Sequence, residues 1–235
     1  MILVLWDIDR TLLYTGGIDR QVYRELFEEV VGRPVVKLPA RGTGVTMPLA
    51  VLELLRVNSV EAGKIRKFAD DIVRRMPAQL LSHQADIADT GRVMPGALAS
   101  LKAVGKSDEL LPTVVTGNLR ESAAIKLRTL ELDRYLDLDI GGYSSDDAHR
   151  PSLVAVAQRR AGRRHGHEFT PQNTVIIGDS LEDVRTGQEG GAAVIGVASG
   201  TTRVDELTSA GARHVIPDLR DPHHLLQLIH ECASK

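Results

Sequence analysis

Residues 2–11 read Ile2-Leu3-Val4-Leu5-Trp6-Asp7-Ile8-Asp9-Arg10-Thr11. The five apolar residues predict a short buried strand, and two carboxylates follow it. Because side chains two apart in an extended chain point to the same side, we expect Asp7 and Asp9 to lie close together. Like charges at that separation favour a cation, and Mg²⁺ binds carboxylate oxygens beside waters and phosphate oxygens. The stretch therefore indicates phosphate chemistry; the alternative is a polar strand end where Asp9 starts a turn.

The composition favours a buried parallel sheet covered by helices. Of the 235 residues, 43% are hydrophobic but only 3% are aromatic, so Val, Leu, Ile and Ala must supply most of the core. The chain has 29 Lys and Arg against 31 Asp and Glu, which gives a formal net charge of -2. This balance offers no overall attraction to nucleic acid or to an anionic membrane, and we expect neither as a partner.

Two further features bear on compartment and cysteine chemistry. The apolar start, Met1 to Trp6, lacks a basic leader and is too short for a signal peptide or a spanning helix, so we expect a cytoplasmic protein. Cys232 is the single cysteine, which excludes a disulfide within the chain. Its place near the end of the last helical pattern favours packing or incidental exposure over a catalytic role.

Short apolar runs alternate with amphipathic helical patterns along most of the chain. Strands are predicted at residues 2–6, 113–116, 174–177, 193–197 and 213–216, and helices at about 119–130, 152–164, 181–190 and 222–232. This alternation predicts an α/β fold with a doubly wound parallel sheet.

The stretch from about Leu13 to Val93 departs from this alternation. It has helical periodicity around residues 19–31, 47–57 and 60–81 but no convincing strand. We therefore predict a core formed by residues 1–13 and 94–235, with an α-helical cap at 14–93. Because the insertion follows the first carboxylates, we expect it to cover them as a lid; the alternative is a helical subdomain that only adds stability.

Two other predicted strands end in polar residues. One ends in Thr116-Gly117-Asn118, where a hydroxyl and the backbone N–H groups at a helix start suit an anion, although Asn118 alternatively caps the helix. The other leads into Gly178-Asp179-Ser180-Leu181-Glu182-Asp183. Asp179 then either faces a site or forms a turn, and the Ser180-x-x-Asp183 spacing also fits a capping box.

Arg150 precedes a proline that can open the helix near Ser152. Its planar guanidinium can hold phosphate, and the alternative is a solvated surface charge. In an open parallel sheet the ligand site lies at the carboxyl ends of the strands, and three predicted strand ends here carry Asp, Thr and Asp. We therefore expect these polar residues to converge.

Together, these segments resemble the four ordered motifs of the haloacid dehalogenase (HAD) superfamily. The resemblance rests on Asp7 to Thr11, Thr116, Arg150 and Gly178 to Asp183, with a helical insertion between the first two motifs. The chain most resembles the phosphoglycolate phosphatase-like hydrolases, which implies a Rossmann-like core and an α-helical cap of the C1 type. The aspartate at Asp9 implies phosphoryl transfer, because the true dehalogenases carry a different residue there.

The resemblance implies an Mg²⁺-dependent phosphatase that forms an aspartyl-phosphate. Asp7 would be the nucleophile and Asp9 the proton donor and acceptor. Thr116 and Arg150 would hold the phosphoryl oxygens. The implied metal site comprises Asp7, Asp9 through its backbone carbonyl, Asp179 and Asp183.

The chain departs from the family pattern at several positions. Arg10 stands where the family often has glycine, and Arg150 stands where lysine is usual. In the insertion, the loop 39–48 resembles a segment that reads Gly-x-Thr-Asp-x in many relatives, with Met47 here replacing the acid. Predicted substrate-binding residues are Gly117, Asn118, Arg41 and Thr46, with a flexible turn as the alternative for the loop.

The expected activity is hydrolysis of a small phosphorylated metabolite, such as phosphoglycolate, a sugar phosphate or a nucleotide. A phosphomutase similar to β-phosphoglucomutase would share every core residue and remains an alternative. A non-catalytic binding protein with the same fold is the second. We expect the metabolite to be the partner, and the protein to be a monomer or a homodimer.

Overall fold

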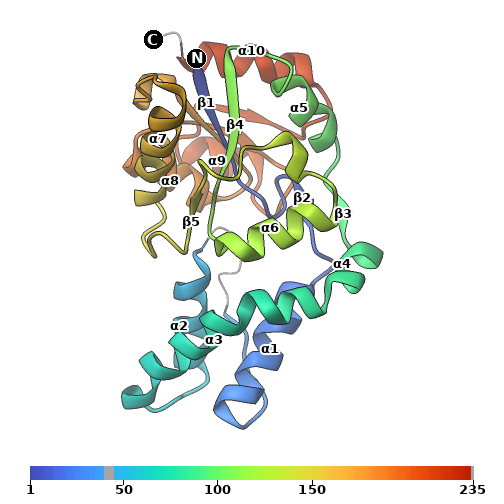
Figure 1. Cartoon of the computed structure of the whole chain (residues 1–235), viewed down its shortest axis with the longest axis vertical. Coiled ribbons are helices and arrows are strands. Elements are labelled where there is room, and N and C mark those ends of the chain that lie inside the picture. Colours follow the sequence, from blue (N-terminus) through green and yellow to red (C-terminus); the bar gives the residue numbers. More distant parts are fainter. Residues whose placement is uncertain (40–44, 234–235) are drawn as a thin grey trace.

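A six-stranded parallel sheet forms the centre of the larger of two lobes (Figure 1). The computed structural model describes residues 1–39 and 45–233. The strand order is β5 (Gly142–Tyr143), β4 (Leu110–Thr116), β1 (Ile2–Trp6), β6 (Thr174–Gly178), β7 (Ala193–Val197) and β8 (His214–Ile216). All neighbouring strands are parallel, and the chain builds the sheet outward from β1 in both directions. The predicted doubly wound, Rossmann-like sheet is confirmed.

Helices cover both faces of this sheet. Ile2, Val4 and Trp6 pack with one set of helices, whereas Leu3 and Leu5 pack with the other. This division follows from the alternation of side chains along a strand. The first set comprises α5 (Ala97–Val104), α6 (Arg120–Thr129) and α10 (Pro222–Ala233), and the second comprises α7 (Ser152–His165), α8 (Leu181–Gly190) and α9 (Val204–Ser209). Cys232 is buried in the first set, as its predicted packing role requires.

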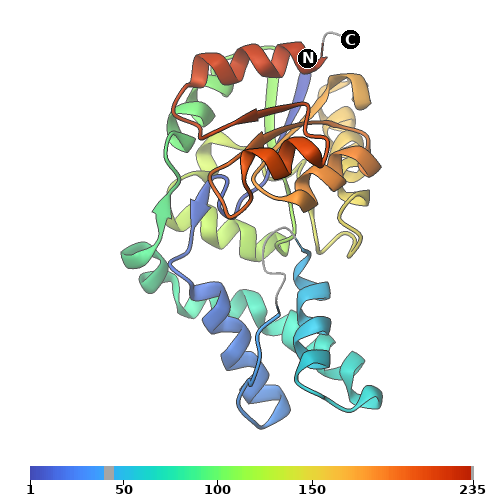
Figure 2. The same cartoon turned by 180° about the vertical axis from the view of Figure 1, so that it is seen from behind.

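Among the described residues, four helices form the second lobe, which lies beyond the carboxyl ends of the strands (Figure 2). They are α1 (Ile18–Val31), α2 (Met47–Val57), α3 (Ala62–Ser82) and α4 (Gln84–Thr90). This lobe has its own apolar core, built around residues such as Phe27, Leu54 and Ile72. Leu119, at the start of α6, also belongs to that core, so the two lobes pack against each other.

Two short strands join the lobes. β2 (Leu13–Tyr14) and β3 (Arg92–Val93) form an antiparallel pair in which Leu13 lies opposite Val93. The prediction that this stretch holds no strand is therefore wrong at its two ends, because two residues are too few to produce a periodic pattern. The division of the chain into two domains at these residues stays a prediction.

The sequence patterns also missed several short elements in the larger lobe. These are α5, α9 and β5, together with the 3₁₀ turns Asp133–Tyr135 and Pro171–Asn173. Each has at most 8 residues, so its apolar positions repeat too few times to be recognised.

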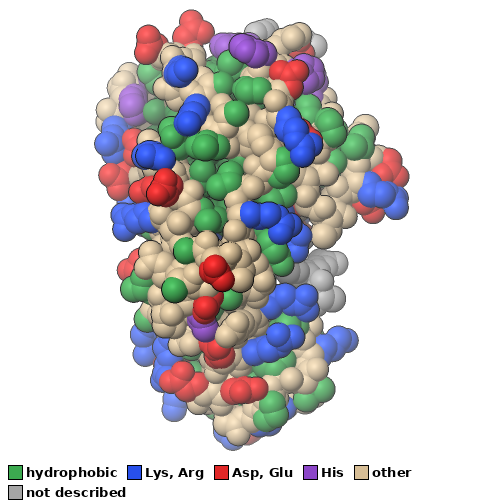
Figure 3. Space-filling model, turned by 90° about the vertical axis from the view of Figure 1, so that its right-hand side faces the viewer, with side chains coloured by type: hydrophobic (Ala, Val, Ile, Leu, Met, Phe, Trp, Pro, Cys, Tyr) green, Lys and Arg blue, Asp and Glu red, His purple; other side chains and the backbone are tan. Residues whose placement is uncertain are grey.

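Two features of the described residues concern membranes and surface charge. None of the described helices combines the length and the apolar composition that a membrane span requires. Positive and negative side chains are interspersed over both lobes on the face in Figure 3. This distribution agrees with the near-neutral composition.

The lobes also meet where β4 ends. The Met47 backbone N–H donates a hydrogen bond to the Gly117 carbonyl at 2.8 Å. A Cβ atom on Gly117 would lie 2.5 Å from the carbonyl oxygen of Val45, so this close approach requires glycine. The Thr46 hydroxyl adds a 2.8 Å hydrogen bond to the Ala148 carbonyl.

We predict that Gly117→Ala lowers the free energy of unfolding by about 1–3 kcal/mol, because the added methyl group meets backbone atoms. The matched control is Gly63→Ala in the exposed part of α3, where the nearest atom is 4.0 Å away. That change should raise the free energy of unfolding by up to about 1 kcal/mol. Urea unfolding measures both, and equal effects of the two substitutions would contradict the packing at Gly117.

Candidate active site

Three buried carboxylates gather at the carboxyl edge of the sheet. Asp7 follows β1, Asp179 follows β6, and Asp183 lies in the first turn of α8. One oxygen from each lies within 4.8 Å of the others. The buried Thr11 hydroxyl lies between them, 3.3 Å from Asp7 Oδ2 and 3.2 Å from Asp179 Oδ1. The adjacent strands β1 and β6 thus bring together Thr11 and Asp179, which are 168 positions apart in the sequence.

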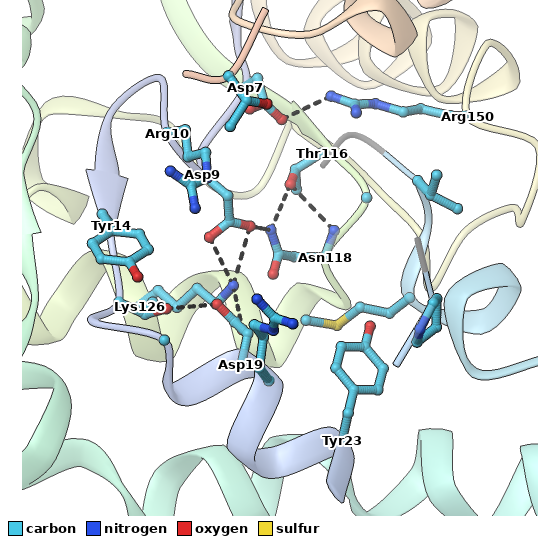
Figure 4. A pocket seen from close by; sticks show the side chains of 18 residues that line it. Asp7, Asp9, Arg10, Tyr14, Asp19, Tyr23, Thr116, Asn118, Lys126 and Arg150 are labelled. Carbon is cyan, nitrogen blue, oxygen red and sulfur yellow. Dashed lines mark hydrogen bonds and ion pairs between the residues drawn. The ribbon is translucent and has the colours of Figure 1, made fainter. Parts of the chain in front are cut away.

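Arg150 is the cation of this cluster. It lies just before α7 with only 4% of its surface exposed. Its Nη2 atom is 2.7 Å from Asp7 Oδ1 (Figure 4). The same atom is 2.5 Å from Asp183 Oδ1. The alternative that Arg150 is a solvated surface charge is therefore wrong.

Asp183 also caps its own helix. Its Oδ2 atom accepts hydrogen bonds from the Ser180 backbone N–H at 2.9 Å and from the Ser180 hydroxyl at 2.6 Å. In return, the Asp183 backbone N–H donates to the Ser180 hydroxyl. The capping box is therefore formed, and it leaves Asp183 Oδ1 directed to Arg150.

Burial dominates the electrostatics of the cluster. It raises the pKa of Asp7 well above its usual value, and the nearby Asp183 adds to this effect while Arg150 opposes it. Burial also raises the pKa of Asp179 to about 7, again with Asp183 adding to the shift. Asp179 Oδ2 is buried and has no hydrogen-bond partner among the described residues.

These properties fit a divalent cation. With every group ionised, three carboxylates and one guanidinium leave two negative charges uncompensated in a buried space. The ligands are all hard oxygen atoms, and the unpartnered Asp179 Oδ2 offers a further lone pair. The acidic cluster could therefore bind such an ion.

Asp9 lies in different surroundings. Its carboxylate accepts hydrogen bonds from Lys126 Nζ at 2.9 and 3.1 Å and from Asn118 Nδ2 at 2.7 Å. The Asp9 carboxylate is therefore paired with Lys126 and Asn118, and a metal ion shared with Asp7 stays a prediction. Strand β1 ends at Trp6, before both carboxylates, and Arg10, just after Asp9, has a left-handed backbone with φ of 65°.

The strand end at Thr116 forms a second polar surface. Thr116 Oγ1 accepts hydrogen bonds from the backbone N–H of Asn118 at 3.2 Å and from its Nδ2 at 2.8 Å. The hydroxyl proton can then be directed to a ligand. The Asn118 side chain bridges Thr116 and Asp9, whereas Leu119 occupies the cap position of α6. The alternative that Asn118 is the helix cap is therefore wrong.

A cavity of about 360 Å³ lies between the two lobes. The core contributes six residues that the sequence analysis selected: Asp7, Asp9, Thr116, Gly117, Asn118 and Arg150. The helical lobe and its connections contribute Tyr14, Asp19, Tyr23 and Met47 (Figure 4). Asp179 and Asp183 do not line the cavity. Each has a carboxylate oxygen within 4.8 Å of one from Asp7.

The sequence predicts two substrate-binding residues in the loop 39–48, and the structure describes only one of them, Thr46. Thr46 is buried, does not line the cavity, and uses its hydroxyl to bind the Ala148 carbonyl. Arg41 lies outside the described residues. Met47, which replaces an acid of the family pattern, does line the cavity.

Sequence reasoning missed Lys126, which lines the cavity from α6 and has 1% of its surface exposed. Its Nζ atom also lies 2.7 Å from Asp19 Oδ1, on α1. One signal could have identified it. Lys126 is three residues after Ala123, on the same side of α6, so a charged residue occupies the apolar side of an amphipathic helix.

One part of the chain matches a known protein family. Residues 150–222 match the family described as HAD-hydrolase-like, a segment that includes Arg150, Asp179 and Asp183. No relative of curated function matches the chain.

Solved structures share the fold of the whole chain. A hydrolase from Pseudomonas syringae is 22% identical, with complete coverage of both chains and a TM-score of 0.72. A putative phosphoglycolate phosphatase from Lactobacillus plantarum is 20% identical, with 97% and 98% coverage and a TM-score of 0.66. A putative β-phosphoglucomutase from Thermotoga maritima is 20% identical, with 97% and 99% coverage and a TM-score of 0.60. Residues 150–222 thus match a HAD-hydrolase-like family, and the whole chain shares its fold with these solved structures.

Proposed function

We propose that the protein is an Mg²⁺-dependent phosphatase that hydrolyses a small phosphorylated metabolite through a phosphoryl group carried on Asp7. One observation supports this proposal most strongly. The Asp7 carboxylate is held by Arg150 and Thr11 at the edge of a cavity into which Thr116 and Asp9 also project. A fixed nucleophile, a hydroxyl donor and a separate acid–base group are the parts that phosphoryl transfer requires.

In the first step an oxygen of Asp7 attacks the phosphorus atom. The bond from phosphorus to the leaving oxygen breaks, and its electron pair stays with that oxygen. Protonated Asp9 gives the leaving oxygen a proton, which produces the alcohol and an aspartyl-phosphate on Asp7.

In the second step a water molecule attacks the phosphorus atom of the aspartyl-phosphate. The Asp9 carboxylate takes a proton from the water, and the bond from phosphorus to the Asp7 oxygen breaks. The products are inorganic phosphate and the original carboxylate of Asp7, with Asp9 protonated for the next cycle.

Arg150 and Thr116 hold the phosphoryl group in this proposal. The guanidinium offsets the charge of Asp7, so that an anionic phosphate can approach an anionic nucleophile. Thr116 offers its hydroxyl proton from the neighbouring strand end. The guanidinium stands where lysine is usual, and its Nη2 atom contacts both Asp7 and Asp183.

Asp7, Asp179 and Asp183 would hold the Mg²⁺ ion, with the Asp9 backbone carbonyl as the further ligand that the family resemblance implies. When bound, the ion supplies positive charge that offsets the charge on the transferring phosphoryl group. The cluster is suited to it because its ligands are buried carboxylate oxygens that contact a single cation, Arg150, among the described residues.

The cavity volume supports a small substrate. About 360 Å³ is near the lower end of the usual range for ligand pockets, and Gly117 and Asn118 form part of its wall. Arg41 is proposed to reach the same substrate from the loop, whereas Thr46 is proposed to act only by anchoring that loop. The proposal includes a cytoplasmic monomer or homodimer with the metabolite as its partner.

A phosphomutase is the second candidate, because the chain is also similar in fold to a putative β-phosphoglucomutase. Both reactions would use the same Asp7 chemistry, and they differ in whether water or a bound sugar receives the phosphoryl group. Activation by a sugar bisphosphate and transfer to sugar would favour the mutase. A binding protein without activity is opposed by the intact set of Asp7, Asp9 and Thr116.

The direct test is phosphate release from a panel of phosphorylated metabolites with and without Mg²⁺. Asp7→Asn should abolish turnover, because it removes the nucleophilic carboxylate. Asp9→Asn should lower kcat by about 10²- to 10⁴-fold, the usual contribution of a positioned proton-transfer group. Asp70→Asn, an exposed carboxylate on α3, is the control and should leave turnover unchanged. Undiminished turnover in Asp7→Asn would exclude the mechanism.

Arg150 can be tested by two substitutions. Arg150→Met should lower kcat by about 10²- to 10³-fold, because it removes the cation beside the transferring group. Arg150→Lys should retain more activity because it keeps a positive charge near Asp7. The measurement is kcat of each variant, corrected for the folded fraction that urea unfolding gives. Equal activity of the Met and Lys variants would argue against a role in holding phosphate.

The raised pKa of Asp179 predicts how stability depends on pH in Mg²⁺-free protein. An unfolded aspartate has a pKa of about 3.9, so between that value and about 7 the folded state binds more protons. This stabilising contribution is complete below about pH 4 and is lost as pH rises through about 7, by up to about 1.4 kcal/mol per pH unit.

Asp179→Asn should therefore remove part of the fall in unfolding free energy between pH 5 and pH 7. Wild-type protein should also gain more stability from added Mg²⁺ at pH 8 than at pH 5.5, because the ion binds the ionised carboxylate. Urea unfolding at each pH measures both effects, with Asp70→Asn as the exposed control. Parallel pH profiles for wild type and Asp179→Asn would contradict the electrostatics of the cluster.

A further inference from the structure

Lys126 is a buried cation held between carboxylates from two lobes. It lies on α6, and its Nζ atom is 2.9 and 3.1 Å from the two oxygens of Asp9. The same atom is 2.7 Å from Asp19 Oδ1, which belongs to α1 of the helical lobe. Figure 4 shows the ammonium group between these two carboxylates, at the wall of the cavity opposite Arg150.

This lysine keeps its charge despite burial. Burial alone would lower the pKa of Lys126, but the carboxylates of Asp19 and Asp9 outweigh that effect and raise it above the usual value. An apolar side chain on this side of α6 would pack without any cost of desolvating a charge. A cation at position 126 therefore has a role other than packing.

The surrounding hydrogen bonds fix the Asp9 carboxylate in one orientation. Lys126 contacts both of its oxygens, and Asn118 Nδ2 donates to Oδ2 at 2.7 Å. The other carboxylate is held in the same way, because the Thr15 hydroxyl donates to Asp19 Oδ2 at 2.7 Å. Asp9 is thus held by Lys126 of α6 and by Asn118 after β4, and Asp19 of α1 binds the same Lys126. We call this arrangement of Lys126, Asn118 and Asp19 around Asp9 the clamp.

We propose that Lys126 is a positioning residue that holds the Asp9 carboxylate for its proton transfers, and that Asp19 links this clamp to the helical lobe. The inference rests on the proposed phosphatase function. It makes the acid–base step depend on the docking of the helical lobe against α6, since Asp19 of α1 reaches Lys126 only when the two lobes are docked. The nucleophile Asp7 is held separately, by Arg150 and Thr11.

This separation predicts which step suffers when Lys126 is lost. With p-nitrophenyl phosphate, the leaving phenolate is stable without a proton, so the first step needs Asp9 little. The second step still needs it: the water oxygen bonds to phosphorus, the bond to Asp7 breaks, and the water proton passes to Asp9. A displaced Asp9 should therefore leave formation of the aspartyl-phosphate intact and slow its hydrolysis.

The experiment compares Lys126→Met with wild type on p-nitrophenyl phosphate in the presence of Mg²⁺. Lys126→Met should release a rapid burst of about one nitrophenol per active site, followed by turnover that is roughly 10-fold or more slower than wild type, with KM affected less. Asp19→Asn should change kcat in the same direction but less, because the contact between Lys126 and Asp9 remains. Lys126→Arg should restore part of the lost rate.

Arg128→Met is the matched control, because it removes an exposed cation from the same helix and should leave the kinetics unchanged. Urea unfolding reports the folded fraction of each variant. A rate that falls only in proportion to that fraction, without a burst, would overturn the inference and assign Lys126 a structural role. Unchanged kinetics in both Lys126→Met and Asp19→Asn would also overturn it. Wild-type protein that releases no phosphate from any ester would instead overturn the proposed function on which the inference rests.

Discussion

The constraint on which the structure depends is the crowding of negative charge at the carboxyl ends of β1 and β6. Asp7, Asp179 and Asp183 offer oxygens within 4.8 Å of one another in a buried space. Arg150 offsets one of those charges, and Thr11 and the helix cap at Ser180 supply further donors. An arrangement of this kind is unfavourable for folding alone, so it favours the binding of a further cation.

A second principle is the separation of two carboxylates that are neighbours in the sequence. Asp7 belongs to the buried cluster with Arg150, whereas Asp9 faces the cavity with Lys126. Each carboxylate therefore has its own cation and its own surroundings. This separation suits a reaction in which one group bonds to phosphorus and the other moves protons. It also ties the second group, through Asp19, to the helical lobe that covers the cavity.

Much of this arrangement follows from local sequence patterns. The strand at residues 2–6 and the helix at 181–190 have the predicted bounds, because long apolar runs and a capping box mark them clearly. The convergence of Asp7, Asp179 and Arg150 also follows, since parallel strands end at one edge of a sheet. The orientation of Asp9 depends on its contacts with Lys126 and Asn118, and the ion pair of Lys126 with Asp19 depends on packing between the lobes. The first leaves no periodic signal in a single sequence, and the second leaves only a charged residue on the apolar side of α6.

The most direct test of the account is to trap the phosphoryl group on the protein. Asp9→Asn should slow hydrolysis of the intermediate, so this variant is incubated with radiolabelled acetyl phosphate and Mg²⁺, quenched in acid and digested. The account predicts one labelled peptide, containing Asp7, whose label is released by hydroxylamine and is absent when Asp7 is also changed to Asn. Phosphate release by wild-type protein with no labelled peptide, or with the label on another residue, would contradict it.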